Sequence, residues 1–195
     1  MTTTPSEGIA PLQATLRDGS VVTVRAATAN DEPALREFLA GLCLEARRLR
    51  FFTGAVDIER AAHQTAAAGP DRFGLIALDD AGRIAGHALC IQVGGDRAEV
   101  AVEVADRLHG QGLGTILVER IAQLAERRGI ACLVAEVLPD NSAMLDVFRD
   151  GFDARVAWRA GVEAVEFPTS TWRLARERFA PASAPPAPAP PEKDV

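Results

Sequence analysis

Residues 98–115 (AEVAVEVADRLHGQGLGT) constrain the fold most, because a strand pattern leads there into a glycine-rich segment and then a helix pattern. Valines and carboxylates alternate from Glu99 to Val104, and this period of two predicts a strand with one apolar and one acidic face. Leucine and isoleucine recur at steps of three and four from Leu113 to Leu124, which predicts an amphipathic helix. The chain is therefore predicted to pass from strand to helix through a glycine-rich turn.

The glycines of this turn have the spacing of a phosphate-binding loop. Gly110, Gly112 and Gly114 occupy alternate positions before Thr115. Residues without a Cβ allow backbone N–H groups to point at one ligand, and the helix N-terminus adds positive potential. A dinucleotide site requires G-x-G-x-x-G/A behind the first strand, whereas Thr115 takes the last position here and several elements precede the loop. Dinucleotide binding is therefore the lesser alternative.

Two segments resemble motifs of the GNAT superfamily of N-acetyltransferases. Motif A has Arg or Gln, two residues, Gly, one residue, and Gly or Ala; residues 109–114 fit this pattern with His109 in the Arg or Gln position. Residues 141–152 resemble motif B, in which an Asn contacts the pantetheine arm of CoA; Asn141 takes that place. Arg50, Phe51 and Phe52, which follow a predicted helix earlier in the chain, also resemble the subgroup that acetylates protein lysines. The resemblance covers roughly residues 20–168.

The resemblance implies that acetyl-CoA is the cosubstrate. We expect no metal, because none of the three histidines has a second ligand at metal spacing. The resemblance also implies a bulge in the central strand at residues 102–104, where backbone amides bind the pantetheine arm and the parallel strand splays away. The residues assigned to acetyl-CoA are Val102, Val104, His109, Gly110, Gln111, Gly112, Leu113, Gly114, Thr115 and Asn141.

The chemistry requires a base, because a lysine amine with a pKa of about 10.4 is protonated at neutral pH. Glu99 and Glu103 are the candidate catalytic residues, on one face of the predicted strand. Glu99 stands about where the protein-acetylating members carry their glutamate, so we predict Glu99 as the general base and Glu103 as a solvated charge. Many members use a Tyr seven residues after the motif B Asn as the acid, but Phe148 holds that position and the chain has no tyrosine.

The remaining elements predict a mixed α+β fold. Apolar runs joined by turns at Asp18–Gly19, 79–82 and 94–96 indicate antiparallel strands before the glycine loop. The nearly unbroken apolar run 131–138 indicates a buried strand parallel to the central one. We predict a GNAT-like, mostly antiparallel sheet of six or seven strands, flanked by about four helices, with a βαβ acetyl-CoA-binding core.

Composition indicates one domain, because 195 residues with 48% hydrophobic and 25% charged residues suit a single core. We predict the domain at residues 13–180, with disordered segments at 1–12 and in the Ala/Pro-rich stretch 181–195. The absence of a signal peptide or membrane-length apolar run predicts a cytoplasmic protein. Cys43, Cys90 and Cys132 are odd in number and widely spaced, so we predict three buried thiols.

The charge balance favours a cationic partner. With 27 acidic against 21 basic residues, the net charge is −6, which argues against nucleic acid and for an amine. We predict an N-acetyltransferase that acts on a primary amine, with a protein lysine, a polyamine, an amino acid or an antibiotic amine as candidate acceptors. The alternative from another class is a CoA-binding sensor module without turnover. A homodimer is possible, but the sequence does not decide it. We expect the arginine cluster at residues 47–50 to be solvated.

Overall fold

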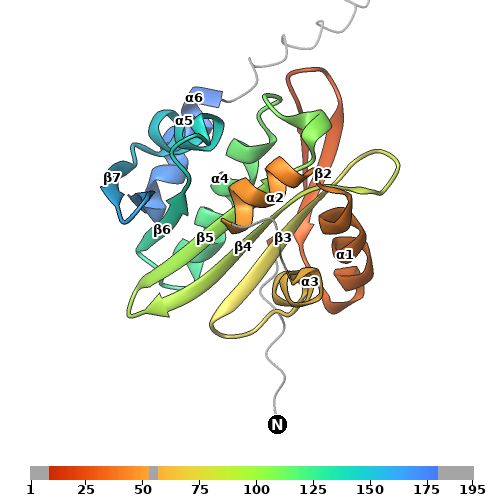
Figure 1. The fold of residues 1–195 in the computed structure, drawn as a ribbon, viewed down its shortest axis with the longest axis horizontal. Coiled ribbons are helices and arrows are strands. Elements are labelled where there is room, and N and C mark those ends of the chain that lie inside the picture. The colour runs from red at the N-terminus through yellow and green to blue at the C-terminus, as the bar shows by residue number, and fades with distance from the viewer. Residues whose placement is uncertain (1–8, 53–56, 180–195) are drawn as a thin grey trace, which may run out of the picture.

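One open sheet organises the molecule (Figure 1). The computed structural model describes residues 9–52 and 57–179. The strands lie in the order β1-β2-β3-β4-β5-β6-β8-β7, and among those described only β5 and β6 are parallel neighbours. They are β1 (Leu12–Thr15), β2 (Val21–Ala26), β3 (Arg72–Leu78), β4 (Ile84–Gly94), β5 (Arg97–Val104), β6 (Cys132–Val137), β7 (Arg155–Arg159) and β8 (Val162–Pro168).

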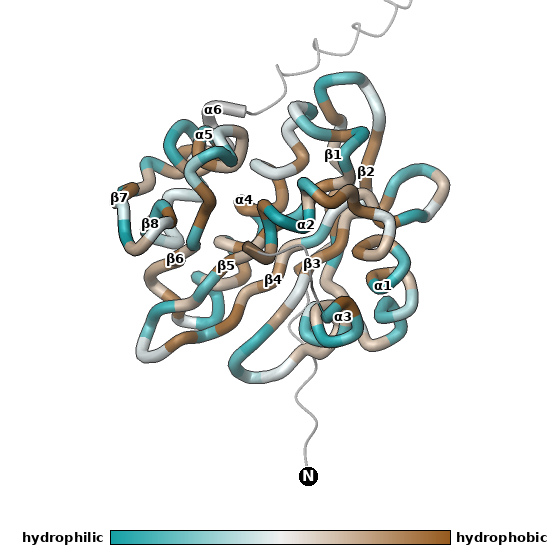
Figure 2. The backbone as a smooth tube through the Cα atoms, viewed as in Figure 1, coloured by the Kyte–Doolittle hydropathy of each residue, from teal (hydrophilic) through white to brown (hydrophobic). Residues whose placement is uncertain are grey.

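Helices cover both faces of this sheet. The helices are α1 (Glu32–Gly41), α2 (Leu44–Phe51), α3 (Ile58–Ala66), α4 (Leu113–Arg127), α5 (Ser142–Phe152) and α6 (Trp172–Phe179). Successive side chains of β3 point to opposite faces of the sheet and so belong to two different cores. Leu75 and Ala77 pack with α4 and α5, whereas Ile76 packs with α1 and α3. Figure 2 shows the hydrophobic residues along the inner strands and the hydrophilic ones on turns and outer helix faces.

The predicted fold class and the βαβ core are confirmed, and the element counts are higher than predicted. The sheet has eight strands instead of six or seven, and the described chain has six α-helices instead of about four. One reason is that residues 32–51 form two helices. Leu42 is extended (φ −65°, ψ 142°) and ends α1, and the Cys43 sulfur accepts a hydrogen bond from the N–H of Ala46 to cap α2.

The burial of the N-terminal segment and of the cysteines differs from prediction. Ile9 is buried in the main core and Leu12 begins β1, so packing extends into the N-terminal segment that we predicted to be disordered. The predicted C-terminal tail, residues 181–195, lies outside the described residues. Only Cys90 of the three thiols is buried, because Cys43 caps a surface helix and Cys132 begins β6 near the sheet surface.

Gly74 of β3 allows α3 to pack closely on the sheet. A Cβ at this position would lie 2.2 Å from the backbone oxygen of Thr65. Gly74→Ala should therefore lower the free energy of unfolding by about 1–3 kcal/mol, because backbone atoms must move to relieve the overlap. Gly41→Ala, where nothing lies within 4 Å, is the matched control and should be neutral or slightly stabilising. Urea denaturation measures both, and equal midpoints for the two variants would contradict this packing.

Candidate active site

The site begins where β6 parts from β5. The parallel pair is in register only from Arg97 to Glu99, whereas β5 stays paired with β4 as far as Val104 opposite Gly86. The edge of β5 beyond Glu99 is therefore open on the β6 side. A cavity of about 510 Å³ fills this wedge, a volume typical of ligand sites.

The predicted bulge at residues 102–104 is absent. The register of β4 with β5 runs without interruption from Gly86–Val104 to Gln92–Ala98, and the irregularity lies beyond Gln92, at the other end of the pair. The wedge opens because β6 diverges, which leaves β5 regular.

The glycine loop forms one end of the cavity. Gly110 and Gly112 have φ of +74° and +91°, in the left-handed region that favours glycine. No side chain caps α4, and its first hydrogen bond runs from the N–H of Ile116 to the oxygen of Gly112. The amide groups of the first helical turn, whose residues Leu113, Gly114 and Thr115 line the cavity, are thus without an intrahelical acceptor. Such a turn can bind a phosphate.

The structure places the other residues predicted for acetyl-CoA around the same cavity, with one exception. Val102, Val104, His109 and Asn141 line it, together with the glycines. Gln111 does not, although its backbone oxygen accepts a hydrogen bond from another segment of the chain.

Two of these side chains are held by the protein itself. Nε2 of His109 lies 3.0 Å from the backbone oxygen of Val104, and because a carbonyl only accepts, this nitrogen carries the proton. Asn141 caps α5 through its side-chain oxygen, which accepts from the N–H of Met144 at 3.2 Å. The amide nitrogen of Asn141 is therefore the part that can serve a ligand.

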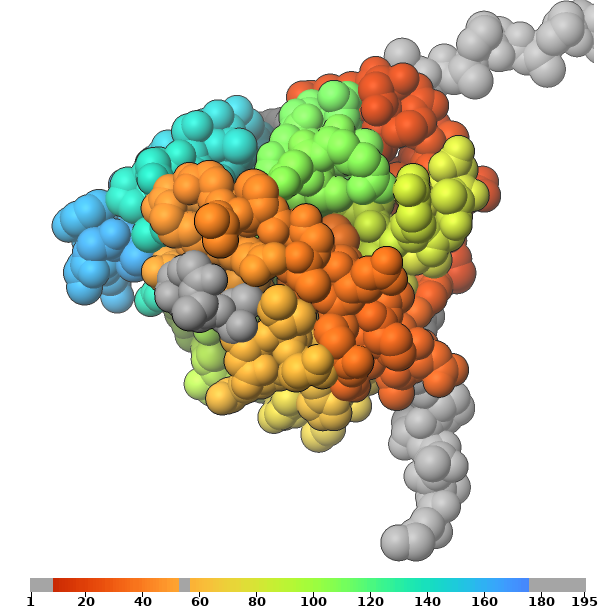
Figure 3. Space-filling view, turned by 45° about the vertical axis from the view of Figure 1, so that its right-hand side comes forward, coloured from red at the N-terminus to blue at the C-terminus, as the bar shows by residue number. Residues whose placement is uncertain are grey.

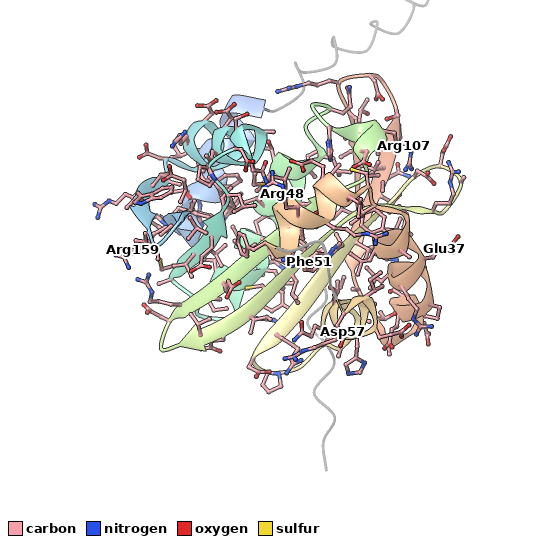
Figure 4. All side chains as sticks on the ribbon, viewed as in Figure 1. Glu37, Arg48, Phe51, Asp57, Arg107 and Arg159 are labelled. Carbon is pink, nitrogen blue, oxygen red and sulfur yellow. The ribbon has the colours of Figure 1, made fainter. Side chains whose placement is uncertain are left out.

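Helix α2 lies over the sheet beside the cavity. In the space-filling view, the orange residues of α2 lie directly below the green loop region and the teal α5 region (Figure 3). Arg48 of α2 bonds to Glu45 on its own helix and to Asp140 before α5, at 2.6 and 2.5 Å (Figure 4). This ion pair links α2 to the β6–α5 connection.

The two candidate carboxylates have different surroundings. Glu99 is exposed, at the apex of the wedge, and it lines the main cavity. Glu103, predicted to be solvated, is instead only 8% exposed, because α2 packs on this face of β5. Burial raises the pKa of Glu103 to about 7, against the opposing charge of Arg50. Glu103 is thus the carboxylate that changes charge near neutral pH.

A second cavity of about 160 Å³ adjoins the first. Glu99, Ala101 and Arg50 line both, so these three residues separate the cavities. The second is enclosed by α2, α3, β4 and β5, and its other lining residues are Phe51, Ala61, Gln64, Thr65, His87, Leu89 and Ile91. Burial and the nearby Arg50 charge lower the pKa of His87 to about 3, so this imidazole is neutral.

Sequence reasoning missed two arginines of the main cavity. Arg50 is half-buried and lines both cavities, whereas we expected it in a solvated cluster. Arg17, from the β1–β2 turn, also lines the main cavity. The Arg-Phe-Phe segment at residues 50–52 was a signal for Arg50; nothing near Arg17 in the sequence indicates its place.

Metal and membrane features are not found in the part of the chain that the structure describes. Across residues 9–52 and 57–179, no group of three or more His, Cys, Asp or Glu side chains is placed to hold a metal ion. None of the helices in these ranges is long and apolar enough to cross a bilayer.

Comparison with known families assigns the chain. The Acetyltransferase (GNAT) family matches residues 43–152, which include β5, the glycine loop and α5. The chain belongs to the GNAT acetyltransferase family. No curated protein matches the chain.

Solved structures agree with this assignment. The chain is 32% identical to the GNAT domain of S. lividans PAT, covering 81% of this chain and 96% of that one, with a TM-score of 0.74. A phosphinothricin acetyltransferase from Sinorhizobium meliloti in complex with AcCoA has the same fold at 18% identity, 75% and 88% coverage, and a TM-score of 0.60. The cAMP-binding acyltransferase from Mycobacterium smegmatis is 20% identical over 87% of this chain, which spans only 54% of that longer protein (TM-score 0.57).

Replacement of Gly112 tests the loop. A Cβ here would enter open space at the cavity and strain the backbone, so Gly112→Ala should remove most of the thermal stabilisation by CoA. Gly82→Ala is the control, because Gly82 has a similar φ of +74° and open surroundings in the β3–β4 turn. Each variant's melting temperature is compared with and without CoA. If CoA raised the melting temperature of Gly112→Ala as much as that of the wild type, the loop would not be the CoA site.

The buried carboxylate predicts a pH-dependent stability. The folded pKa of Glu103 exceeds its ordinary 4.5, so its contribution is present below pH 4.5 and is lost as the pH rises to about 7. Glu103→Gln removes the buried charge and should stabilise the protein at pH 8 by about 1–3 kcal/mol, with little effect at pH 5. Calorimetry at both pH values measures this. Exposed Glu136→Gln is the control, and the same small effect for both variants would contradict the prediction.

Proposed function

We propose that this protein transfers an acetyl group from acetyl-CoA to a primary amine, with a protein lysine as the acceptor. The observation that carries the proposal is the wedge between β5 and β6, which has a phosphate-binding loop at one end and Glu99 at the other. Membership of the GNAT family supports acetyl transfer, and the likeness to the GNAT domain of PAT supports a protein acceptor.

The residues of the main cavity fit acetyl-CoA. The unpaired amides at the start of α4 would bind the pyrophosphate, and the open edge of β5 at Val102 and Val104 offers backbone groups to the amides of the pantetheine arm. The side-chain nitrogen of Asn141 would add a donor to the arm. When bound in this way, acetyl-CoA supplies an activated thioester carbonyl near the apex of the wedge.

The acceptor would approach through the second cavity. Its apolar residues, Phe51, Leu89 and Ile91 among them, suit the methylene groups of a lysine, and Glu99 attracts the ammonium group where the two cavities meet. Neutral His87 adds no repelling charge, and the charge of Arg50, which lines both cavities, is opposed by Glu103 and Glu99. Charge also favours this class of partner, because the chain carries a net charge of −6.

Glu99 is the proposed general base. It takes the proton from the ammonium group directly or through one water, and the neutral amine then attacks the thioester carbonyl. Because Glu99 is exposed, the proton can pass on to solvent. Phe148 lines the cavity at the position of the family's Tyr, so the departing thiolate takes its proton from water. We place the reaction in the cytoplasm, since all three cysteines are free thiols.

A CoA sensor without turnover is the second candidate. The observation that favours it is the lack of any tyrosine acid, which leaves the cavity with binding groups and exposed or half-protonated carboxylates only. Turnover with labelled acetyl-CoA and lysates separated into protein and small-molecule fractions distinguishes the two, because a sensor binds CoA and leaves both fractions unlabelled.

Substitution of Glu99 tests the mechanism. Glu99→Gln keeps the size of the side chain and removes the proton acceptor, so the turnover rate should fall by roughly 10²- to 10⁴-fold while CoA affinity is unchanged. Raising the pH should restore part of this loss, because more of the amine is already neutral. Initial rates between pH 6.5 and 9.5 measure both effects.

Glu103→Gln is the paired comparison and should lose far less activity. If Glu103→Gln gives the large, pH-rescuable loss and Glu99→Gln does not, the buried carboxylate is the base. If neither variant differs from wild type, the amine loses its proton to solvent.

A further inference from the structure

The main cavity has the wrong charge balance for its proposed ligand. Five carboxylates line it, against two arginines and one histidine: Glu99, Glu103, Glu136, Asp146 and Asp150 against Arg17, Arg50 and His109. The phosphates of CoA are strongly anionic, and the loop from His109 to Thr115 contains no lysine or arginine. The ring of His109 is bonded to the backbone of Val104. Any lysine or arginine charge at the loop end of the cavity therefore comes from another part of the chain.

Arg17 lies at that end although it is 93 residues from the loop in sequence. Its Nη1 donates to the backbone oxygen of Gly110 at 3.1 Å, and its backbone N–H donates to the oxygen of Gln111 at 3.1 Å. Figure 1 shows the β1–β2 turn beside the green segment that connects β5 to α4, and Figure 3 shows red N-terminal residues against the green region. The N-terminal hairpin is thus attached to the glycine loop by two hydrogen bonds.

The charge of Arg17 is not neutralised by a neighbour in the described ranges. The side chain is exposed, and no carboxylate of residues 9–52 or 57–179 forms an ion pair with it. The adjacent Asp18 accepts instead from the N–H and hydroxyl of Ser20, at 2.9 and 2.6 Å.

Other arginines near the cavity differ in this respect. Arg107 donates to Asp79 at 2.8 Å, and Arg48 bonds to both Glu45 and Asp140. Arg50 lies toward the other end of the cavity, where the charges of Glu99 and Glu103 act on it.

We propose that Arg17 binds the pyrophosphate of acetyl-CoA and supplies the positive charge that the glycine loop lacks. One guanidinium donor holds Gly110, and the planar group has further donors for phosphate oxygens beside the amides of the loop. The hairpin then forms one wall of the cofactor site. This inference rests on the proposed function, because it concerns the cosubstrate of the same cavity.

Calorimetric titration tests the proposal without knowledge of the acceptor. The ligands are CoA, dephospho-CoA, which lacks the 3′-phosphate, and pantetheine, which lacks all phosphates. Arg17→Gln keeps a side-chain N–H donor and loses the charge, so it should bind CoA and dephospho-CoA roughly tenfold more weakly, with pantetheine unaffected. Arg17→Lys should recover part of the affinity, because it restores the charge.

Arg159→Gln is the matched control. It removes the same charge from an exposed residue of β7, at the edge of the sheet opposite β1 (Figure 4), and should bind CoA as the wild type does. The CoA affinity of Arg17→Gln should also depend less steeply on salt concentration than that of the wild type.

Three results would overturn the inference. If Arg17→Gln bound CoA as tightly as the wild type does, Arg17 would not contact the cosubstrate. An equal loss for pantetheine would show that the substitution distorts the cavity, and a loss confined to CoA would assign the contact to the 3′-phosphate. Failure of the proposed function is a separate result, in which the wild type itself does not bind CoA.

Discussion

The short pairing of β5 with β6 is the constraint on which the rest of the site depends. Buried backbone groups need hydrogen-bond partners, and a strand edge that loses its neighbour after three residues leaves such groups open inside the molecule. A ligand with its own amides can pair with that edge in place of a strand. The α4 crossover sets the loop at one end of the gap, and the hairpin from β1 to β2 holds the loop from outside.

The electrostatics of the site divide along the same gap. Helix amides and Arg17 contribute positive charge at the loop end, whereas Glu99 and Glu103 contribute negative charge at the apex. Arg50 lies with Glu99 at the boundary of the second cavity. Burial of Glu103 opposes the stability of the fold above neutral pH, because its ionised form is poorly solvated there. A carboxylate kept at such a cost is expected where the fold serves a ligand more than its own stability.

Local pattern was enough to predict the parts of the site that are contiguous in sequence. The strand, the glycine loop, α4 and the parallel β6 follow from periodicity and from the backbone conformations that glycine favours. The burial of Glu103 could not be predicted, because the strand pattern shows two faces and not which helix covers the acidic one; α2 covers it through contacts between distant segments. Arg17 was missed for the same reason, since its role depends on a contact over 93 residues. The predicted bulge failed because it came from the family's pattern, while this chain opens the wedge by divergence of β6.

In the proposed mechanism, Glu99 at the boundary of the two cavities would take the proton of the amine before the amine reaches the thioester. A base in this role has to stand on the side from which the amine would approach, and Glu99 lines both cavities. An exposed carboxylate can then release the proton to water between turnovers. In the same proposal the thiolate would leave along the wedge toward the loop, and water would suffice to protonate it because a thiol has a pKa of only about 8.5. With water as the proton source for the thiolate, this proposal requires no phenol, which is consistent with Phe148 lining the cavity where many family members have a tyrosine.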